Sequence, residues 1–188
     1  MRKKIEEIIE ESISVKEGLI SSHLDAIEKS AEAIIKTLKA GGKVLIFGNG
    51  GSAADSQHFA AELVGRFLKE RKGLPAIALT TNTSVLTAIA NDYSYDEVFS
   101  RQIDALASGN DIAVGISTSG KAANVIKAIE LANKKGMATI ALTGNDGGGL
   151  AKISKISIIV PSKSTPRIQE AHVAIVHILC QMAEDALF

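Results

Sequence analysis

Two pairs of side chains have a spacing that places chemical groups on one face of a helix. His58 and Glu62 are four residues apart in a segment with helical periodicity, so both project from the same side. Gln169 and His177 are eight residues apart near the C-terminus, which separates them by about 80° around a helix and two turns along it. If the two helices meet, two imidazoles, a carboxylate and an amide oxygen could hold a borderline divalent ion such as zinc. The alternative is a salt-bridged surface for the first pair and a half-buried polar stripe for the second.

Glu62 and His177 also suit proton transfer on a sugar. Moving a proton between adjacent carbons requires a carboxylate or an imidazole beside the carbon acid. We therefore assign Glu62 as a candidate general base and His177 as a candidate general acid. His172 and Glu170 occupy other positions around the last helix, and we expect them to be packing or exposed groups.

A glycine-rich turn follows the first expected strand of the chain. Its sequence is Gly48-Asn49-Gly50-Gly51-Ser52, and a helix is expected immediately after it. The glycines allow close approach of the backbone to a ligand, and a helix start offers free N–H groups to an anion. The spacing is not that of the dinucleotide-binding or nucleotide-triphosphate fingerprints. A tight turn without a ligand remains the alternative.

A second loop offers three successive hydroxyl groups, from Ser117, Thr118 and Ser119. Capping of the following helix by Ser119 would account for one hydroxyl but not for three. Two such loops at one edge of a sheet favour a phosphorylated small molecule as the ligand. The polar stretches 80–84 and 143–146 are explained adequately as turns and caps. Asn91 and Asp92 suit a turn as well as a ligand contact.

From residue 43 onward, short apolar runs alternate with longer helical segments. We expect strands at 43–47, 76–79, 111–116, 138–142 and 156–160. We expect helices near 53–69, 84–107 with a break near Tyr93, 121–135 and 166–187. This alternation is typical of an α/β fold with a doubly wound, five-stranded parallel sheet flanked by helices. Ligands of such sheets bind beyond the carboxyl ends of the strands.

An N-terminal helical extension precedes the α/β core. Residues 3–40 contain two runs of apolar residues at helical spacing, and Gly41-Gly42 ends the second run. We expect a single domain over 1–188, with helices in 1–40 and the α/β core in 41–188. The first helix has an apolar stripe and little else to pack against it, so we expect it to lie at a subunit interface.

Composition narrows the classes of partner and the compartment. The chain has 188 residues and a formal net charge of zero, so no global field attracts it to nucleic acid or to an anionic membrane. No apolar segment has the length that a membrane span or a signal peptide requires. Cys180 is the one cysteine, and it lies in an apolar helical stretch that favours core packing. We expect a soluble protein of the reducing cytoplasm.

Residues 48–63 resemble the signature of the phosphoheptose isomerase family, which belongs to the sugar isomerase (SIS) domain superfamily. The stretches 86–92, 115–120, 141–144 and 167–172 resemble further blocks of that family. The resemblance covers essentially the whole chain, including the N-terminal helices.

The resemblance implies an aldose–ketose isomerase that converts sedoheptulose 7-phosphate to D-glycero-D-manno-heptose 7-phosphate. This is the first step toward the ADP-heptose of the lipopolysaccharide core. It further implies a homotetramer with sites between subunits and one zinc ion per subunit. The implied zinc ligands are His58, Glu62, Gln169 and His177, of which Glu62 and His177 would also form the acid/base pair.

The resemblance also implies a set of substrate contacts. Ser52, Ser117, Thr118 and Ser119 would hold the phosphate. The sugar site would be lined by Asn49, Gly50, Gly51, Glu62, Asn91, Asp92 and Gln169. Lys121-Ala122 departs from the polar pair with a serine that we expect in many relatives, which affects phosphate affinity more than reaction class.

Three alternatives remain open at this stage. Close paralogues act as non-catalytic tetrameric scaffolds that bind the bacterial replication initiator, and we expect them to lack a carboxylate at the position of Glu62. A sugar-phosphate sensor with the same fold would need no acid/base pair. Both readings conflict with the presence of Glu62 and His177. A third alternative is isomerisation of a five- or six-carbon sugar phosphate, because pocket length cannot be measured in a sequence.

Overall fold

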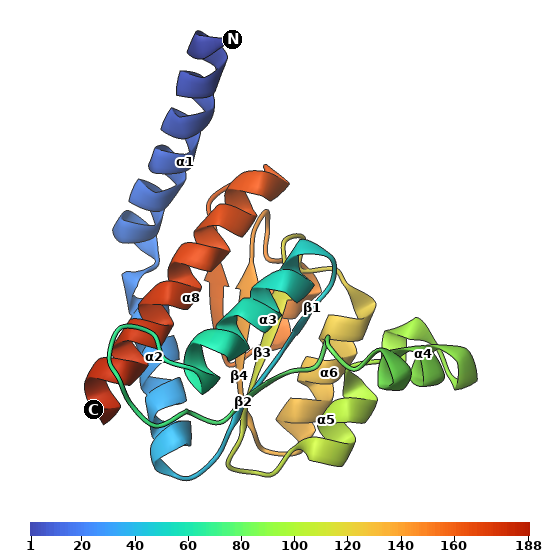
Figure 1. Ribbon diagram of the computed structural model, residues 1–188. Coiled ribbons are helices and arrows are strands. Elements are labelled where there is room, and N and C mark those ends of the chain that lie inside the picture. Colours follow the sequence, from blue (N-terminus) through green and yellow to red (C-terminus); the bar gives the residue numbers. More distant parts are fainter.

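A five-stranded parallel sheet forms the centre of the computed structural model, which describes residues 1–188 (Figure 1). The strands stand in the order β2-β1-β3-β4-β5. Their bounds are β1 Val44–Gly48, β2 Ala76–Ala78, β3 Ile112–Ser117, β4 Ala138–Thr143 and β5 Ile156–Ile159. The helices are α1 Arg2–Ser22, α2 Leu24–Lys39, α3 Gly51–Val64, α4 Thr83–Asp92, the 3₁₀ helix η1 Tyr95–Glu97, α5 Ser100–Leu106, α6 Ala123–Lys134, α7 Gly148–Ile153 and α8 Thr165–Leu187.

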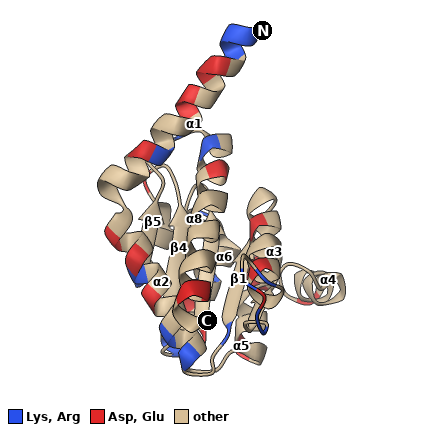
Figure 2. Ribbon diagram, turned by 60° about the vertical axis from the view of Figure 1, so that its left-hand side comes forward, with Lys and Arg blue, Asp and Glu red and all other residues tan.

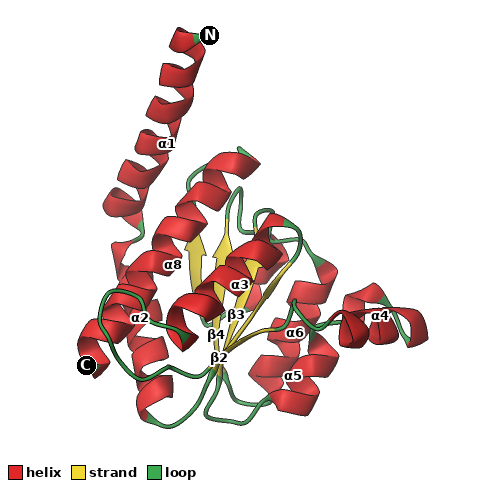
Figure 3. Ribbon diagram, in the orientation of Figure 1, coloured by secondary structure: helices red, strands yellow, loops and turns green.

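Both faces of the sheet are buried, because successive side chains of each central strand enter different cores. Val44 and Ile46 of β1 belong to a core that also takes in residues of α2, α3 and α8. Leu45 and Phe47 belong to a second core with residues of α5, α6 and α7. Figure 3 shows helices on both sides of the strands. The predicted doubly wound five-stranded parallel fold is therefore confirmed.

Two features of the α/β core differ from the prediction by more than one or two residues: the end of one helix and the presence of another. The helix expected to reach residue 69 ends at Val64, because the backbone N–H groups of Phe67, Leu68 and Lys69 donate to the Glu184 carboxylate instead of continuing the helix. The short helix α7 was not predicted. The helix begins at Gly148, directly after Gly147, and these two residues have φ of 55° and 77° respectively. Adjacent glycines are typical of a turn, so the sequence pattern did not indicate a helix here. The predicted break near Tyr93 is confirmed, since α4 ends at Asp92.

The first helix projects beyond the edge of the sheet at which the strands end (Figure 1). Only Val15 and Leu19 of α1 are buried. Arg167 at the start of α8 holds α1 by donating to the carbonyl of Ile8 at 2.6 Å. Ile9, which is 54% exposed, lies on the apolar part of this helix that the chain leaves uncovered.

Charged side chains of both signs are interspersed along the helices, and the first turn of α1 is basic (Figure 2). None of the helices combines the length and the apolar character that crossing a bilayer requires.

Candidate active site at the sheet's switch point

The strand order reverses between β1 and β3. From β1 the chain passes to β2 on one side, and it returns to β3 on the other side. In doubly wound sheets with this order, ligands bind in the crevice beyond the carboxyl ends of the two strands at the reversal. The loops that follow β1 and β3 are the two loops predicted to hold phosphate.

Residues 48–52 form the glycine loop, and residues 117–119 form the hydroxyl loop. The glycine loop makes a tight turn into α3. Gly50, which precedes the helix, has φ of 57°, a backbone conformation that favours glycine. The Ser52 amide donates to the carbonyl of Asn49 at 3.0 Å. At Gly48, a Cβ would lie 2.7 Å from the carbonyl oxygen of Ile116, so glycine lets the turn lie directly against the end of β3.

The hydroxyl loop is braced by its neighbour after β4. The amide of Gly144 donates to the carbonyl of Thr118 at 3.1 Å, and the side-chain amide of Asn145 donates to the same oxygen. Ser119 is exposed, and its hydroxyl accepts from the Lys121 amide at 3.3 Å. The loop is thus held in shape from one side. Ser119 does not cap α6, because the helix begins after Ala122 without a side-chain cap and the Ser119 hydroxyl accepts only from Lys121, ahead of the helix.

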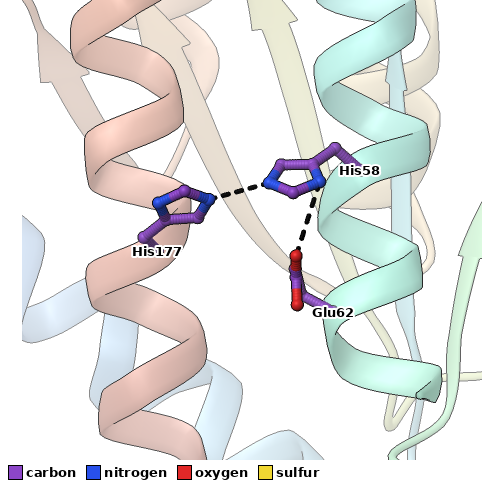
Figure 4. A group of neighbouring side chains, drawn as sticks. All are labelled: His58, Glu62 and His177. Carbon is purple, nitrogen blue, oxygen red and sulfur yellow. Dashed lines mark hydrogen bonds and ion pairs between the residues drawn. The ribbon is translucent and has the colours of Figure 1, made fainter. Parts of the chain in front are cut away.

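His58, Glu62 and His177 come together where α3 and α8 run side by side (Figure 4). The Nε2 atoms of His58 and His177 are 2.7 Å apart, and His58 Nδ1 lies 3.5 Å from Glu62 Oε1. One nitrogen or oxygen of each residue lies within 4.8 Å of the others. The predicted spacing therefore brings two imidazoles and a carboxylate into one cluster.

Gln169 lies on α8, away from the cluster of His58, Glu62 and His177. A Cβ added to Gly51 would meet the side-chain amide of Gln169, so this amide lies beside the glycine loop. Since α3 rises about 1.5 Å per residue, that position is about two turns from His58. In this conformation Gln169 faces the glycine loop rather than the histidine cluster.

Asn91 and Asp92 are exposed at the end of α4, where their side chains hydrogen-bond to each other at 2.8 Å. Helix α4 projects from the side of the molecule opposite α8 (Figure 1). Within one chain, these two residues are not brought to the cluster of His58, Glu62 and His177.

Asp55 is a group at the site that the sequence analysis missed. Burial raises its pKa to about 6, and nearby His58 acts in the opposite direction. Its Oδ2 atom is buried without a hydrogen-bond partner. The signal was available in the spacing, because Asp55 precedes His58 by three residues and Glu62 by seven, which puts all three on one face of α3.

The donor set of the cluster suits a divalent metal ion. Two imidazole nitrogens and one carboxylate are a ligand set that zinc takes in catalytic sites, where a further position stays open. The three donors already lie within 4.8 Å of one another. Such a group can serve as a metal-binding triad.

Comparisons with known proteins agree with this architecture. The family model of the SIS domain matches residues 8–144. A phosphoheptose isomerase of Thermodesulfovibrio yellowstonii is 54% identical over 185 residues, which cover 98% of this chain and 92% of that protein. The solved structure of a phosphoheptose isomerase from Neisseria gonorrhoeae superposes with a TM-score of 0.92 at 44% identity and covers 98% of each chain. One from Francisella tularensis superposes with a TM-score of 0.93 at 40% identity and covers 97% of each chain. The chain therefore belongs to the phosphoheptose isomerase family of SIS-domain proteins.

Proposed function

We propose that this protein is an aldose–ketose isomerase that converts sedoheptulose 7-phosphate to D-glycero-D-manno-heptose 7-phosphate. The product leads toward the ADP-heptose of the lipopolysaccharide core. The observation that carries the proposal is the cluster of Glu62, His58 and His177 on the two helices beside the switch-point loops. Relatives that are more than half identical and are phosphoheptose isomerases support the same reaction.

The substrate phosphate binds between the glycine loop and the hydroxyl loop. Donors come from the N-terminus of α3 and from Ser52, Ser117, Thr118 and Ser119, because backbone N–H groups and hydroxyls at a helix start suit an anion. The sugar extends from there along α3. Asn49, Gly50, Gly51 and Gln169 line its path, and Asn91 and Asp92 contribute through another subunit or through movement of α4.

Glu62 acts as the base on the carbon acid. Its carboxylate removes a proton from C1 of the open-chain ketose, which gives an enediolate with a double bond between C1 and C2. Return of the proton to C2 then leaves a carbonyl group at C1, which is the aldehyde of the aldose. His177 moves the balancing proton between the oxygens on C1 and C2. Each transfer needs a group within hydrogen-bond reach of the reacting atom. A carboxylate oxygen of Glu62 and a ring nitrogen of His177 lie within 4.8 Å of each other, so both can reach one substrate.

Zinc is the metal that we assign to the triad, with His58, Glu62 and His177 as ligands and Gln169 as a further ligand if its side chain turns. When bound, zinc would stabilise negative charge on the enediolate oxygens. Because His58 Nδ1 faces Glu62 and its Nε2 faces His177, the carboxylate can also orient the His58 ring for the metal.

The assembly that we propose is a homotetramer in the cytoplasm, with sites between subunits. Ile5, Ile9 and Ile13 on α1 are each about half exposed, at 51%, 54% and 50%. Between α2 and α8 lies an apolar hollow of about 590 Å³ that includes Ile178 and Met182. Uncovered apolar faces of this extent are typical of subunit interfaces. The single cysteine, Cys180, is buried and unpaired, which suits a reducing compartment.

Substrate identity is tested by supplying the purified, zinc-loaded protein with ketose phosphates of five, six and seven carbons. We expect turnover of sedoheptulose 7-phosphate at a kcat/KM at least about 100-fold above the shorter sugars, a difference of about 2.7 kcal/mol. Equal turnover of a shorter sugar would overturn the assigned substrate while leaving the isomerase chemistry in place. No turnover of any of them would overturn the enzyme assignment.

A further inference from the structure

Asn49 and Asn124 join the two sides of the switch-point crevice through their side chains. Asn49 Nδ2 donates to Asn124 Oδ1 at 2.8 Å, and Asn124 Nδ2 donates to Asn49 Oδ1 at 2.9 Å. Asn49 follows β1 in the glycine loop, whereas Asn124 is the second residue of α6, which follows the hydroxyl loop. Asn124 is only 3% exposed, so it cannot contact a ligand to any significant extent.

The backbone fixes the direction of both amides. The Val125 N–H donates to Asn124 Oδ1 at 2.9 Å, and an N–H can be accepted only by the oxygen of that amide. The orientation of Asn124 is therefore determined, and with it the orientation of Asn49, since the two amides exchange hydrogen bonds. Tyr95 supports the same orientation, because its hydroxyl donates to Asn49 Oδ1 at 3.3 Å.

One hydrogen of Asn49 remains without a partner in this arrangement. The Nδ2 atom carries two hydrogens, and Asn124 accepts one of them. Asn49 is half-buried at the mouth of the crevice, next to the glycines and Ser52 that receive the sugar phosphate in the proposed function. Its free N–H is thus available to a ligand oxygen in that crevice.

We propose that Asn124 is a positioning residue for the isomerase reaction, on the basis of the proposed function. It holds the Asn49 amide in the one orientation that presents an N–H, rather than a carbonyl oxygen, to an oxygen of the sugar phosphate. Without Asn124 the Asn49 amide can turn by 180°, which would replace a donor by an acceptor. Tyr95 can still donate to Asn49, but a hydroxyl also accepts, so it does not fix the direction alone.

A purely structural role for Asn124 is the competing explanation, because it also binds the first turn of α6. The variant Asn124→Asp separates the two roles. Aspartate keeps an oxygen for the Val125 N–H and suits a helix N-terminus, so the start of α6 is retained. It cannot donate to Asn49 Oδ1, so the orientation of Asn49 is no longer specified.

The test is a double-mutant cycle with wild type, Asn49→Ala, Asn124→Asp and the double variant. For each protein, kcat and KM for sedoheptulose 7-phosphate, the equilibrium affinity for the same sugar phosphate and the melting temperature are measured. We expect Asn124→Asp to lower kcat/KM and affinity about tenfold, the range of a single hydrogen bond. Burial of the carboxylate also lowers the melting temperature, so all four proteins are assayed well below their melting temperatures. In the Asn49→Ala background, the same substitution should have no further effect, because the residue acts through Asn49.

If the fold-losses in kcat/KM of the two single variants multiply in the double variant, the proposal is overturned, because the added charge would then act on the ligand without Asn49. An Asn124→Asp variant with wild-type kcat/KM and affinity would overturn it as well. Absence of turnover in the wild type rejects the proposed reaction. The affinities of the four proteins for the sugar phosphate then show by themselves whether Asn124 acts through Asn49. If sedoheptulose 7-phosphate does not bind the wild type, both proposals fail.

Discussion

The Nε2 atoms of His58 and His177 face each other at 2.7 Å, although 119 residues separate them in the chain. Two imidazole nitrogens approach this closely when one carries a proton and the other accepts it. The pair joins the middle of α3 to the middle of α8. It therefore fixes the distance between the helix that carries Glu62 and the helix that carries His177.

Removal of the metal should lower both activity and stability. Zinc at 100 times its dissociation constant would stabilise the folded state by about 2.7 kcal/mol, which a thermal melt detects as a higher melting temperature. We expect a chelator to lower turnover and added zinc to restore it. His177→Gln should abolish the zinc-dependent rise in melting temperature, whereas His23→Gln, outside the cluster, should retain it. An unchanged rate and an unchanged melting temperature after chelation would leave the cluster as an acid/base site without metal.

Replacement of Glu184 should destabilise the protein strongly. Glu184 and Arg71 form an ion pair at 2.6 Å in which both side chains are 1% exposed. Removing one partner of a buried pair typically costs about 3–5 kcal/mol, so Glu184→Gln should lower the free energy of unfolding in urea by that amount. Asp185→Asn is the matched control, because its ion pair with Lys69 is half exposed and is worth about 0–1 kcal/mol. Equal losses in the two variants would contradict the assigned role of Glu184.

The same carboxylate makes stability depend on acid pH. Although burial acts in the opposite direction, hydrogen bonds from the backbone of Lys69 and Leu68 and from Arg71 lower the pKa of Glu184 from 4.5 to about 2. A depressed folded-state pKa contributes stability that is complete above 4.5 and is lost as the pH falls toward 2. The difference in unfolding free energy between wild type and Glu184→Gln should therefore shrink over that interval. A difference independent of pH would rule out a charged Glu184.

His172 should weaken the fold at mildly acid pH. Its Nε2 donates to the carbonyl of Thr143 at 3.1 Å, while its Nδ1 is buried without a partner. Burial lowers its pKa from 6.5 to about 4, so the unfolded chain binds a proton in this interval that the folded chain excludes. Stability should fall as the pH drops from 6.5 to 4. His172→Gln, which can still donate to Thr143, should show a flatter profile in the same urea titrations; a profile as steep as that of wild type would contradict this assignment.

An acidic side chain on the uncovered stripe of α1 should disrupt the assembly. Ile9 is 54% exposed in the single chain, and burial of a carboxylate at its position in an interface carries a large penalty. We expect wild type to sediment as a tetramer and Ile9→Asp to sediment as a smaller species with lower activity. Glu10→Gln, one residue away, should behave as wild type. A tetrameric Ile9→Asp variant, or a monomeric wild type, would show that α1 does not form the interface.

The sequence predicted those parts of the molecule whose causes are local. Continuous apolar runs locate the central strands, because β1 and β3 are buried on both faces. The four-residue spacing predicted that His58 and Glu62 share a face of one helix, and their 3.5 Å separation agrees. The glycine loop was predicted because tight turns into a helix require glycine at defined positions.

Features with distant causes escaped the prediction. The end of α3 depends on Glu184, more than 110 residues further along the chain, which no local pattern reveals. Gln169 and His177 share a broad helix face, yet one lies beside Gly51 and the other beside His58, because two turns of helix separate them. The hydrogen bonds between Asn49 and Asn124 join loops that only the sheet order brings together.

Conversion of sedoheptulose 7-phosphate by wild type and by Glu62→Gln, measured side by side with zinc supplied, tests the central claim most directly. Glutamine preserves the size of the side chain and removes the base. General-base catalysis typically contributes about 10²–10⁴-fold, so we expect the variant to lose at least about 100-fold in kcat while it still binds the sugar phosphate. Turnover by Glu62→Gln at a rate near that of wild type would contradict the account, because the proton would then be moved by another group.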